Sequence, residues 1–366
     1  MPKITNHVNN RIQILDCTLR DGGLAIEDAY LNENIVDIFT TEEIKTVSEV
    51  LSESMIDIIE LGSIEISDQD KKKFAIYQNI EEISTKTPHK SKDDQLVAAL
   101  FRGPDTPIEN IPNVKDSYVD VLRVILRYSE LQKSIDFCAH LVKKGYKVFI
   151  QPMVTMRYTE EEINMLIESA NEMKAYALYF VDSYGYMDKN NIENLYNIYD
   201  ENLEDDIKIG FHAHNNISSA FSNACWFIEY AMNKENSSRK IVVDSCILGM
   251  GQGAGNAQTE LLANYLNNKW SKSYNFPPIL DACEIIEKHN NENLWGYSVT
   301  NMLPAINKTA YKYSFTLRNK YGYPYRRIYE ILRSMPEDLR HRYTLKNTKN
   351  LINLYNSGKL TGDNDK

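Results

Sequence analysis

The sequence predicts an α/β fold in which eight strands alternate with helices and close into a (β/α)8 barrel, followed by a small helical C-terminal domain. Two observations predict this architecture. Short runs rich in β-branched residues are separated by longer stretches with apolar residues at helical spacing, a pattern typical of βαβ units and a parallel sheet. Eight such repeats fill roughly 260 residues, which is the usual length of a barrel with eight strands.

The eight predicted strands follow one another along the first two thirds of the chain. They are Ile12–Thr18, Met55–Gly62, Gln95–Arg102, Val119–Leu126, Lys147–Val154, Ala177–Ser183, Ile207–His214 and Lys240–Ile247. Two of the helices between them have a recognisable start, because Thr40 precedes Glu43 and Thr159 precedes Glu162 by three residues. This spacing fits a capping box, in which the threonine and glutamate side chains bond to each other's backbone amides.

The tail of the chain is predicted to form a separate domain. Asn275–Pro278 indicates a linker, and the residues after it are rich in Tyr, Lys, Arg and Asn, with no strand pattern. We therefore divide the chain into a barrel over residues 1–275 and a helical domain over residues 276–366. The segment Gly22–Thr40 is long for a βα loop. It is interpreted either as a lid or wall over the site, or as a surface insertion.

Composition and charge exclude several classes of function. The 366 residues are 43% apolar and 25% charged, as in an ordinary globular protein. With 41 basic and 51 acidic residues, the net charge of −10 provides no broad footprint for nucleic acid or an anionic membrane. The sequence lacks an 18-residue apolar run and a signal-peptide pattern, so we expect a cytoplasmic protein. Five scattered cysteines without a CxxC motif indicate reduced thiols.

Two histidines and one aspartate are candidate metal ligands. His212 and His214 end the seventh predicted strand, and side chains two residues apart on a strand point the same way. Asp21 directly follows the first strand, whose end lies close to that of the seventh at the mouth of a barrel. Two imidazoles and one carboxylate suit a divalent metal. The same residues would also be compatible with two histidines of purely structural role and an exposed turn containing Arg20 and Asp21.

A glycine-rich loop follows the eighth strand. Residues 249–256 read Gly–Met–Gly–Gln–Gly–Ala–Gly–Asn, so the loop carries few side chains where it crosses the predicted mouth. Asn256 could then present an oxygen to the metal. A flexible turn and a phosphate-binding loop are two further interpretations, because a single glycine-rich loop is weak support for either.

Three further polar residues lie at or near the ends of predicted strands. Glu60 ends an otherwise apolar strand, and burying a carboxylate is costly unless it is paired. We therefore expect Arg20 as its partner, or a role for Glu60 in proton transfer. Ser183 ends the sixth strand, and Gln151 lies late in the fifth. Each of these residues could instead be a solvated polar side chain with no role in a site.

Three motifs resemble the signatures of a known superfamily. They are Asp16–Gly23 (DCTLRDGG), His212–Asn216 (HAHNN) and Gly249–Glu260 (GMGQGAGNAQTE). In this order and at these strand ends, they resemble the metal-dependent lyase/synthase TIM barrels. That superfamily includes 4-hydroxy-2-oxovalerate aldolase, hydroxymethylglutaryl-CoA lyase, isopropylmalate synthase and homocitrate synthase. The resemblance covers about residues 10 to 270, and Trp295–Ser298 is more similar to the aldolase branch.

The resemblance implies a role for each candidate residue. The residues that match metal ligands are Asp21, His212, His214 and Asn256. Arg20 matches an arginine that stabilises an enolate. Ser183 matches a serine that touches the substrate carboxylate, and Glu60 matches a glutamate near the metal. We add Gln151 as a substrate-binding residue. The cofactor implied is Mg²⁺ or Mn²⁺, with Zn²⁺ as an alternative.

The sequence departs from the family at the position of the catalytic base. Where the aldolase branch has a histidine three residues after the metal-binding aspartate, this chain has Leu24. The aldolases also have a tyrosine that acts as an acid, and its position aligns near Asn301 in this chain. The group that moves the proton is therefore left open among a metal-bound water, Glu60, Tyr184, Tyr186 and Tyr297.

The predicted function is a divalent-metal-dependent aldolase or carbon–carbon lyase acting on a pyruvate-type 2-oxo acid and an aldehyde. A Claisen-type acyl-CoA condensing enzyme is a second hypothesis, although Gly23–Leu24 replaces the Glu–Gln pair of the synthases. The pattern is also compatible with a non-heme Fe(II) oxygenase and with a degenerate barrel that serves as a binding subunit. We expect a homodimer. The related aldolases meet an aldehyde-consuming dehydrogenase, but nothing in this sequence supports such a partner.

Overall fold

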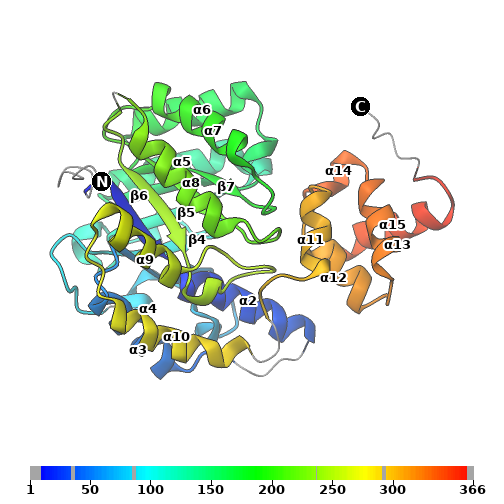
Figure 1. Cartoon of the computed structure of the whole chain (residues 1–366), viewed down its shortest axis with the longest axis horizontal. Coiled ribbons are helices and arrows are strands. Elements are labelled where there is room, and N and C mark those ends of the chain that lie inside the picture. Colours follow the sequence, from blue (N-terminus) through cyan, green and yellow to red (C-terminus); the bar gives the residue numbers. More distant parts are fainter. Residues whose placement is uncertain (1–9, 34–37, 85–87, 236, 291–293, 361–366) are drawn as a thin grey trace.

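The structure is a closed parallel barrel followed by a cluster of helices (Figure 1). In this computed structural model the described residues are 10–33, 38–84, 88–235, 237–290 and 294–360. The barrel strands are β1 (Ile12–Asp16), β2 (Ile58–Ile64), β4 (Leu96–Phe101), β5 (Val121–Leu126), β6 (Lys147–Pro152), β7 (Ala177–Asp182), β8 (Lys208–Ala213) and β9 (Ile241–Ser245). Pairing of β1 with both β9 and β2 closes the ring. The predicted fold class is confirmed, and each predicted strand overlaps an observed one.

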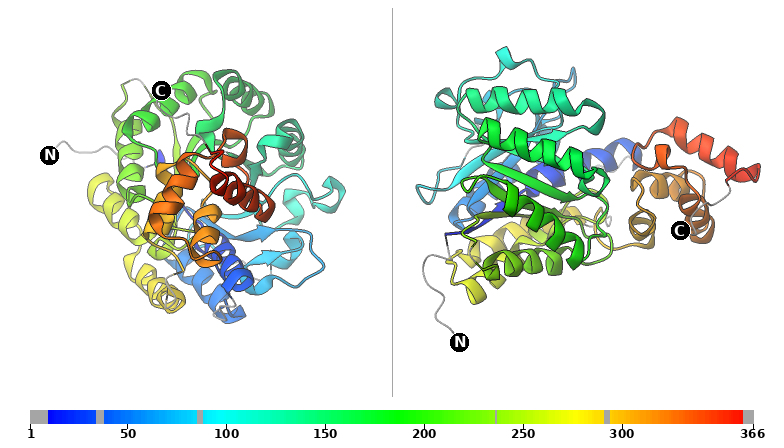
Figure 2. Two further views of the ribbon diagram at one scale, coloured as in Figure 1. Left: turned by 90° about the vertical axis from the view of Figure 1, so that its right-hand side faces the viewer. Right: turned by 90° about the horizontal axis from the view of Figure 1, so that it is seen from above.

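Helices surround the barrel, as the view along its axis shows (Figure 2, left). They are α2 (Thr18–Glu33), α3 (Thr41–Glu53), α5 (Leu131–Lys143), α6 (Glu160–Met173), α7 (Lys189–Asn202), α8 (Ala220–Asn233) and α9 (Thr259–Trp270). A short strand β3 (Ile76–Tyr77) pairs outside the ring with β2, and a short helix α4 (Ile80–Ser84) follows it. Both predicted capping boxes are present, at Thr40 with Glu43 and at Thr159 with Glu162.

The prediction of a long loop over Gly22–Thr40 is wrong. Helix α2 begins directly after β1 and contains Gly22 and Gly23, while residues 34–37 lie outside the described part of the chain. Packing explains the glycines, because a Cβ on Gly23 would lie 1.9 Å from the carbonyl oxygen of Phe74. Gly23 therefore allows α2 to approach the backbone at Phe74, and Gly22 leaves room for the Met250 side chain. The two glycines lie within the helix and do not form a turn.

The predicted linker at Asn275–Pro278 is also wrong. Its prolines lie in the first turn of helix α10 (Phe276–Glu287), a position where proline is favoured because the amides there have no partner in the helix. This helix packs against α3 and buries Ile279 in the barrel core. The domain division at residue 275 stays a prediction; in the structure the barrel core extends to Trp295 and a second core begins at Leu303.

The second core is formed mainly by helices, with Met335 between two of them. These helices are α11 (Val299–Ile306), α12 (Lys312–Asn319), α13 (Tyr325–Arg333), α14 (Glu337–Arg340) and α15 (Leu345–Asn356). Figure 2 shows this helical domain over one open end of the barrel, the end to which the strands point with their carboxyl termini. Active sites of barrels of this type lie at that end, so the helical domain covers the mouth where a site is expected.

Side chains join the helical domain to the barrel mouth. Tyr311 and Lys312 both bind the Asp28 carboxylate of α2, at 2.5 and 2.8 Å. The Asn216 side-chain amide, from the loop after β8, donates to the backbone carbonyl of Asn301 at 2.9 Å. None of the helices in the described part of the chain has the length and apolar character needed to cross a membrane.

Candidate metal centre and active site

The structure brings together the predicted metal ligands Asp21, His212 and His214. Strand β8 carries His212, His214 follows one residue beyond its end, and Asp21 lies in the first turn of α2 after β1. One ligand atom from each of the three side chains lies within 4.8 Å of the others. This is the convergence expected at the mouth of a barrel, where the ends of different strands meet. The group could therefore hold a metal ion.

Each histidine of this group is fixed through its Nδ1 atom. His214 Nδ1 lies 2.8 Å from the carbonyl oxygen of Asp182, and His212 Nδ1 lies 2.8 Å from Asp244 Oδ2. Because both partners accept hydrogen bonds, Nδ1 carries the proton and Nε2 of a neutral ring is left with a lone pair. Such an arrangement orients the histidine ligands of metal sites.

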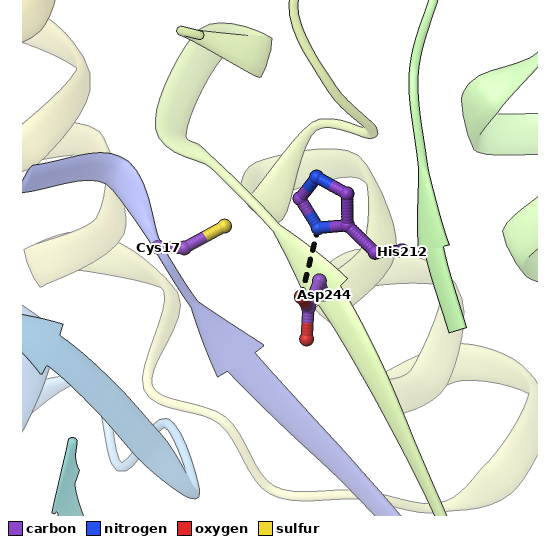
Figure 3. A group of neighbouring side chains, drawn as sticks. All are labelled: Cys17, His212 and Asp244. Carbon is purple, nitrogen blue, oxygen red and sulfur yellow. Dashed lines mark hydrogen bonds and ion pairs between the residues drawn. The ribbon is translucent and has the colours of Figure 1, made fainter. Parts of the chain in front are cut away.

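His212 has a second neighbour, Cys17, whose sulfur is directed toward the imidazole (Figure 3). Cys17, His212 and Asp244 form another group whose ligand atoms lie within 4.8 Å of one another. Both oxygens of Asp244 are already engaged, because Arg123 forms an ion pair with Oδ2 and the Tyr179 hydroxyl donates to Oδ1 at 3.0 Å. We interpret this second group as the support that positions His212.

The charges around the group shift the titration of all three side chains. Burial opposes the charged form of His212, but the hydrogen bond to Asp244 prevails and raises the pKa of His212 to about 9. Burial and the neighbouring His212 lower the pKa of His214 to about 4. Burial would raise the pKa of Asp21, but the adjacent Arg20 guanidinium holds it below its ordinary value. The aspartate is therefore an anion, as a ligand of a metal cation should be.

Asn256 lies beside Asp21 and presents an unpartnered oxygen. Its Nδ2 donates to Asp21 Oδ2 at 2.5 Å and to the Met250 carbonyl at 3.1 Å. Its Oδ1 is buried and has no hydrogen-bond partner within the described ranges. An orphaned buried oxygen next to a carboxylate and two imidazoles fits a divalent cation. A Cβ on Gly251 would lie 2.7 Å from Asp21 Oδ2, so the glycine-rich loop permits this close approach.

The expected pairing of Glu60 with Arg20 is present and belongs to a larger buried network. Glu60 Oε2 accepts from Arg20 Nε at 2.8 Å and from Arg123 Nη1 at 2.7 Å. Arg20 Nη1 also contacts Asp21 Oδ1 at 2.6 Å. Glu60 is 1% exposed and does not line the cavity, whereas Arg20 does. The network therefore fixes the guanidinium of Arg20 at the edge of the metal group.

A cavity of about 230 Å³ opens above this group. Two of the predicted substrate-binding residues, Gln151 and Ser183, line it. Gln151 Nε2 is buried without a partner among the residues that the structure describes, so it is a donor with no acceptor. Ser183 Oγ accepts from the Val154 amide at 2.7 Å, which leaves its own proton for another acceptor. Leu24 also lines the cavity.

Several residues of the site were not predicted from the sequence. Arg123 and Asp244 lie in the apolar strands β5 and β9, and the argument that singled out Glu60, a charge in a buried strand, applies to both. The cavity also receives Ala310, Tyr311 and His341 from the helical domain. No sequence signal indicates these three, because their position depends on how the helical domain docks.

Comparisons with known proteins agree with this architecture. Residues 11–286 match the sequence model of the HMGL-like family. A 4-hydroxy-2-oxovalerate aldolase of Thermomicrobium roseum is 29% identical over 263 residues, which are 70% of this chain and 66% of that protein. The protein of the same name from Geobacillus genomosp. 3 is 26% identical over 75% of this chain and 76% of its own length.

Solved structures show the same fold. The N-terminal domain of a putative aldolase from Bacteroides vulgatus gives a TM-score of 0.67 at 20% identity, covering 85% of this chain and 98% of that one. Hydroxymethylglutaryl-CoA lyase from Pseudomonas aeruginosa gives 0.59 at 14% identity, over 78% and 95%. The carboxyl transferase domain of Rhizobium etli pyruvate carboxylase gives 0.67 at 12% identity, over 98% and 63%. With three quarters of its length matched by the family model, the chain belongs to the HMGL-like family.

Proposed function

We propose that this protein is a divalent-metal-dependent aldolase, a carbon–carbon lyase that acts on a 2-oxo acid and an aldehyde. The observation that carries the proposal is the convergence of Asp21, His212 and His214 in a cavity beside the fixed guanidinium of Arg20. The family and the relatives named 4-hydroxy-2-oxovalerate aldolase support the same class of reaction.

The residues that hold the cation are Asp21, His212 and His214, with Asn256 Oδ1 as a fourth ligand. Because the donor set mixes imidazole with carboxylate and amide oxygens, we propose Mg²⁺ or Mn²⁺, with Zn²⁺ as an alternative. When bound, the ion supplies Lewis-acid polarisation of the carbonyl of the 2-oxo acid.

The protein's own side chains bind the substrate and stabilise the charge that forms. Arg20 stabilises the negative charge of the enolate produced when the carbon–carbon bond breaks, because a fixed positive group in a buried site favours such charge. Glu60 positions Arg20 without reaching the cavity. Gln151 Nε2 and the Ser183 hydroxyl, which both line the cavity, are the donors for the substrate's carboxylate.

A direct assay tests this proposal. The purified protein, loaded with Mn²⁺ or Mg²⁺, is mixed with short 4-hydroxy-2-oxo acids, and release of pyruvate is followed. We expect release that a chelator abolishes and added metal restores. Absence of release with any metal and any acid of the series would contradict the proposal. A parallel reaction with acetyl-CoA and a 2-oxo acid distinguishes an aldolase from a Claisen-type condensing enzyme. The condensing enzyme would release free CoA thiol.

Two finer expectations from the sequence, a homodimer and a cytoplasmic location, stay predictions. Sedimentation velocity on the purified protein tests the dimer, and fractionation of cells tests the location.

A further inference from the structure

We propose that Tyr184, through its hydrogen bond to His341 of the helical domain, is the residue that exchanges a proton with the substrate's hydroxyl group. This inference rests on the proposed aldolase function and deepens it by assigning the missing acid–base group. It joins a side chain of the barrel to one of the helical domain across the mouth of the cavity. Both Tyr184 and His341 line the cavity that contains Arg20, His212 and His214.

A chain of three polar groups fixes the direction of the hydrogen bonds. The Tyr184 hydroxyl is hydrogen-bonded to His341 Nδ1, and His341 Nε2 lies 2.8 Å from Glu337 Oε1. A carboxylate can only accept, so Nε2 of His341 carries a proton and Nδ1 is the acceptor for the tyrosine. The two rings also stack, with centroids 5.9 Å apart. Tyrosine, imidazole and carboxylate are therefore arranged as nucleophile, base and orienting carboxylate are in catalytic triads.

The need for such a group follows from the cavity itself. Leu24, which follows Asp21 by three residues and cannot transfer a proton, lines the cavity. Beyond Arg20 and the metal group, the titratable side chains on the described part of the cavity lining are three: Tyr184, Tyr311 and His341. The proton donor or acceptor of the reaction is therefore one of these, or a water molecule.

The remaining groups named from the sequence are placed less favourably. Glu60 lies outside the cavity lining and its Oε2 is held by two arginines. Neither Tyr186 nor Tyr297 lines the described cavity, and Tyr297 is 61% exposed. Position therefore favours Tyr184 over Glu60 and over both of these tyrosines.

Tyr311 lines the cavity but has a different partner. Its hydroxyl donates to Asp28 Oδ2 at 2.5 Å, and the same carboxylate binds Lys312 at 2.8 Å and Gln252 Nε2 at 2.7 Å. Three side chains therefore share this carboxylate, whereas the partner of Tyr184 is an imidazole that Glu337 orients. Histidine is the side chain used most often for general acid–base catalysis, so the pair Tyr184–His341 is the better acid–base unit.

The proposed step conserves atoms and charge. In the cleavage direction, the substrate hydroxyl gives its proton to Tyr184 Oη while the tyrosine's own proton passes to His341 Nδ1. The O–H electron pair becomes the second bond of the aldehyde carbonyl, and the pair of the broken carbon–carbon bond stays on the 2-oxo acid fragment as an enolate. Glu337 stabilises the imidazolium that forms. In the direction of synthesis the same steps run backwards, and Tyr184 donates the proton to the new alkoxide.

Burial is consistent with this role for the tyrosine. Tyr184 is 8% exposed, and its burial raises the pKa of its hydroxyl. The residue is therefore protonated at neutral pH and needs a neighbouring base to accept its proton as it takes another. His341 provides that base from the opposite side of the interface.

The first test compares two neighbouring tyrosines in the metal-loaded, full-length protein. For Tyr184→Phe we expect kcat of carbon–carbon cleavage to fall about 10²-fold or more, with metal content and KM changed by less than a factor of about three. Tyr186→Phe is the matched control, because its ring stacks on Tyr184 without lining the described cavity; wild-type kcat is expected. Wild-type kcat in Tyr184→Phe, or a loss confined to Tyr311→Phe, would overturn the proposal.

The second test distinguishes proton transfer from packing. His341→Ala is expected to lose activity and to regain it when imidazole is added, with the regained rate proportional to the neutral imidazole concentration. A purely structural loss would not respond in this way, so failure of imidazole to restore kcat would overturn the proposal. Failure of the proposed function is seen separately, as a wild-type protein that cleaves no 4-hydroxy-2-oxo acid.

Discussion

The barrel and the helical domain contribute to one cavity by different means. The barrel builds its part from strand ends and a buried network of charges, in which Arg20, Glu60 and Arg123 are each 6% exposed or less. The helical domain places Tyr311 and His341 over the mouth. The family match covers the barrel and ends at residue 286. We therefore expect the barrel to determine the class of reaction, and the helical domain to supply further side chains that complete the site.

The two regions also differ in how firmly their side chains are held. Buried ion pairs fix the barrel site, since removing one partner would leave an uncompensated charge in the interior. The helical domain is held by pairs such as Lys312 with Asp28, whose side chains are 36% and 23% exposed, and exposed pairs contribute little. Loss of the buried ion pairs of the barrel should therefore abolish activity, whereas loss of an exposed ion pair at the interface should only tune it.

The largest effect is expected from removing the metal ligands. In the double variant His212→Ala/His214→Ala, bound metal should be lost and cleavage of the 2-oxo acid should fall by about 10⁴-fold or more, because the Lewis acid is gone. Metal analysis after gel filtration and a pyruvate-release assay measure both quantities. Stoichiometric metal in this variant would rule out the ligand assignment.

Arg20 provides the next largest effect. Arg20→Ala should lower kcat by about 10²- to 10³-fold, because fixed charge beside the developing enolate is lost. Arg20→Lys is the matched variant, and it should recover only part of the activity because an ammonium cannot reproduce the contacts to both Glu60 and Asp21. Steady-state kinetics decide the matter; a kcat within a few-fold of wild type in Arg20→Ala would remove Arg20 from the mechanism.

A smaller effect is expected from Asp244, through the pH dependence of metal binding. With the pKa of His212 raised to about 9, the metal-free ring is protonated at neutral pH and binding must displace that proton. Metal affinity should therefore rise about tenfold per pH unit from pH 7 to 9. Asp244→Asn should weaken binding about 10- to 100-fold and flatten this slope. Calorimetric titration at several pH values measures both, and an unchanged slope would show that Asp244 does not control His212.

The smallest effect is expected at the interface with the helical domain. Lys312→Met removes the ion pair with Asp28, which is worth ~0.2–1 kcal/mol in an exposed position. KM for the 2-oxo acid should rise no more than a few-fold, and metal affinity should not change. Kinetics and metal titration on the same preparation check both statements. Loss of metal binding in this variant would mean that the two regions are not separable.

Much of the barrel site could be predicted from the sequence, because its residues lie at the ends of predicted strands. Those strands are recognisable because strand-like and helix-like segments alternate along the chain. His212 and His214 share one strand face, and Asp21 follows the first strand, so closing the barrel is enough to bring them together. The buried pair Arg20–Glu60 followed from the cost of burying a lone carboxylate. These inferences needed only local patterns and the rule that parallel strands end at the same face.

The remaining features depend on tertiary packing that no local pattern records. Two adjacent glycines, Gly22 and Gly23, indicate a turn by propensity, yet their helix is stabilised because it packs against the backbone at Phe74. Prolines 277 and 278 indicate a linker but begin a helix. His341 belongs to no motif, and it reaches the cavity because the helical domain docks on the barrel mouth.

The most direct test is an anomalous-scattering map of crystals soaked in Mn²⁺. We predict one strong peak at the barrel mouth, within bonding distance of the Asp21 carboxylate and the Nε2 atoms of His212 and His214. No peak there, or a peak among Cys17, His212 and Asp244 instead, would contradict the assignment of the metal centre and the aldolase function built on it.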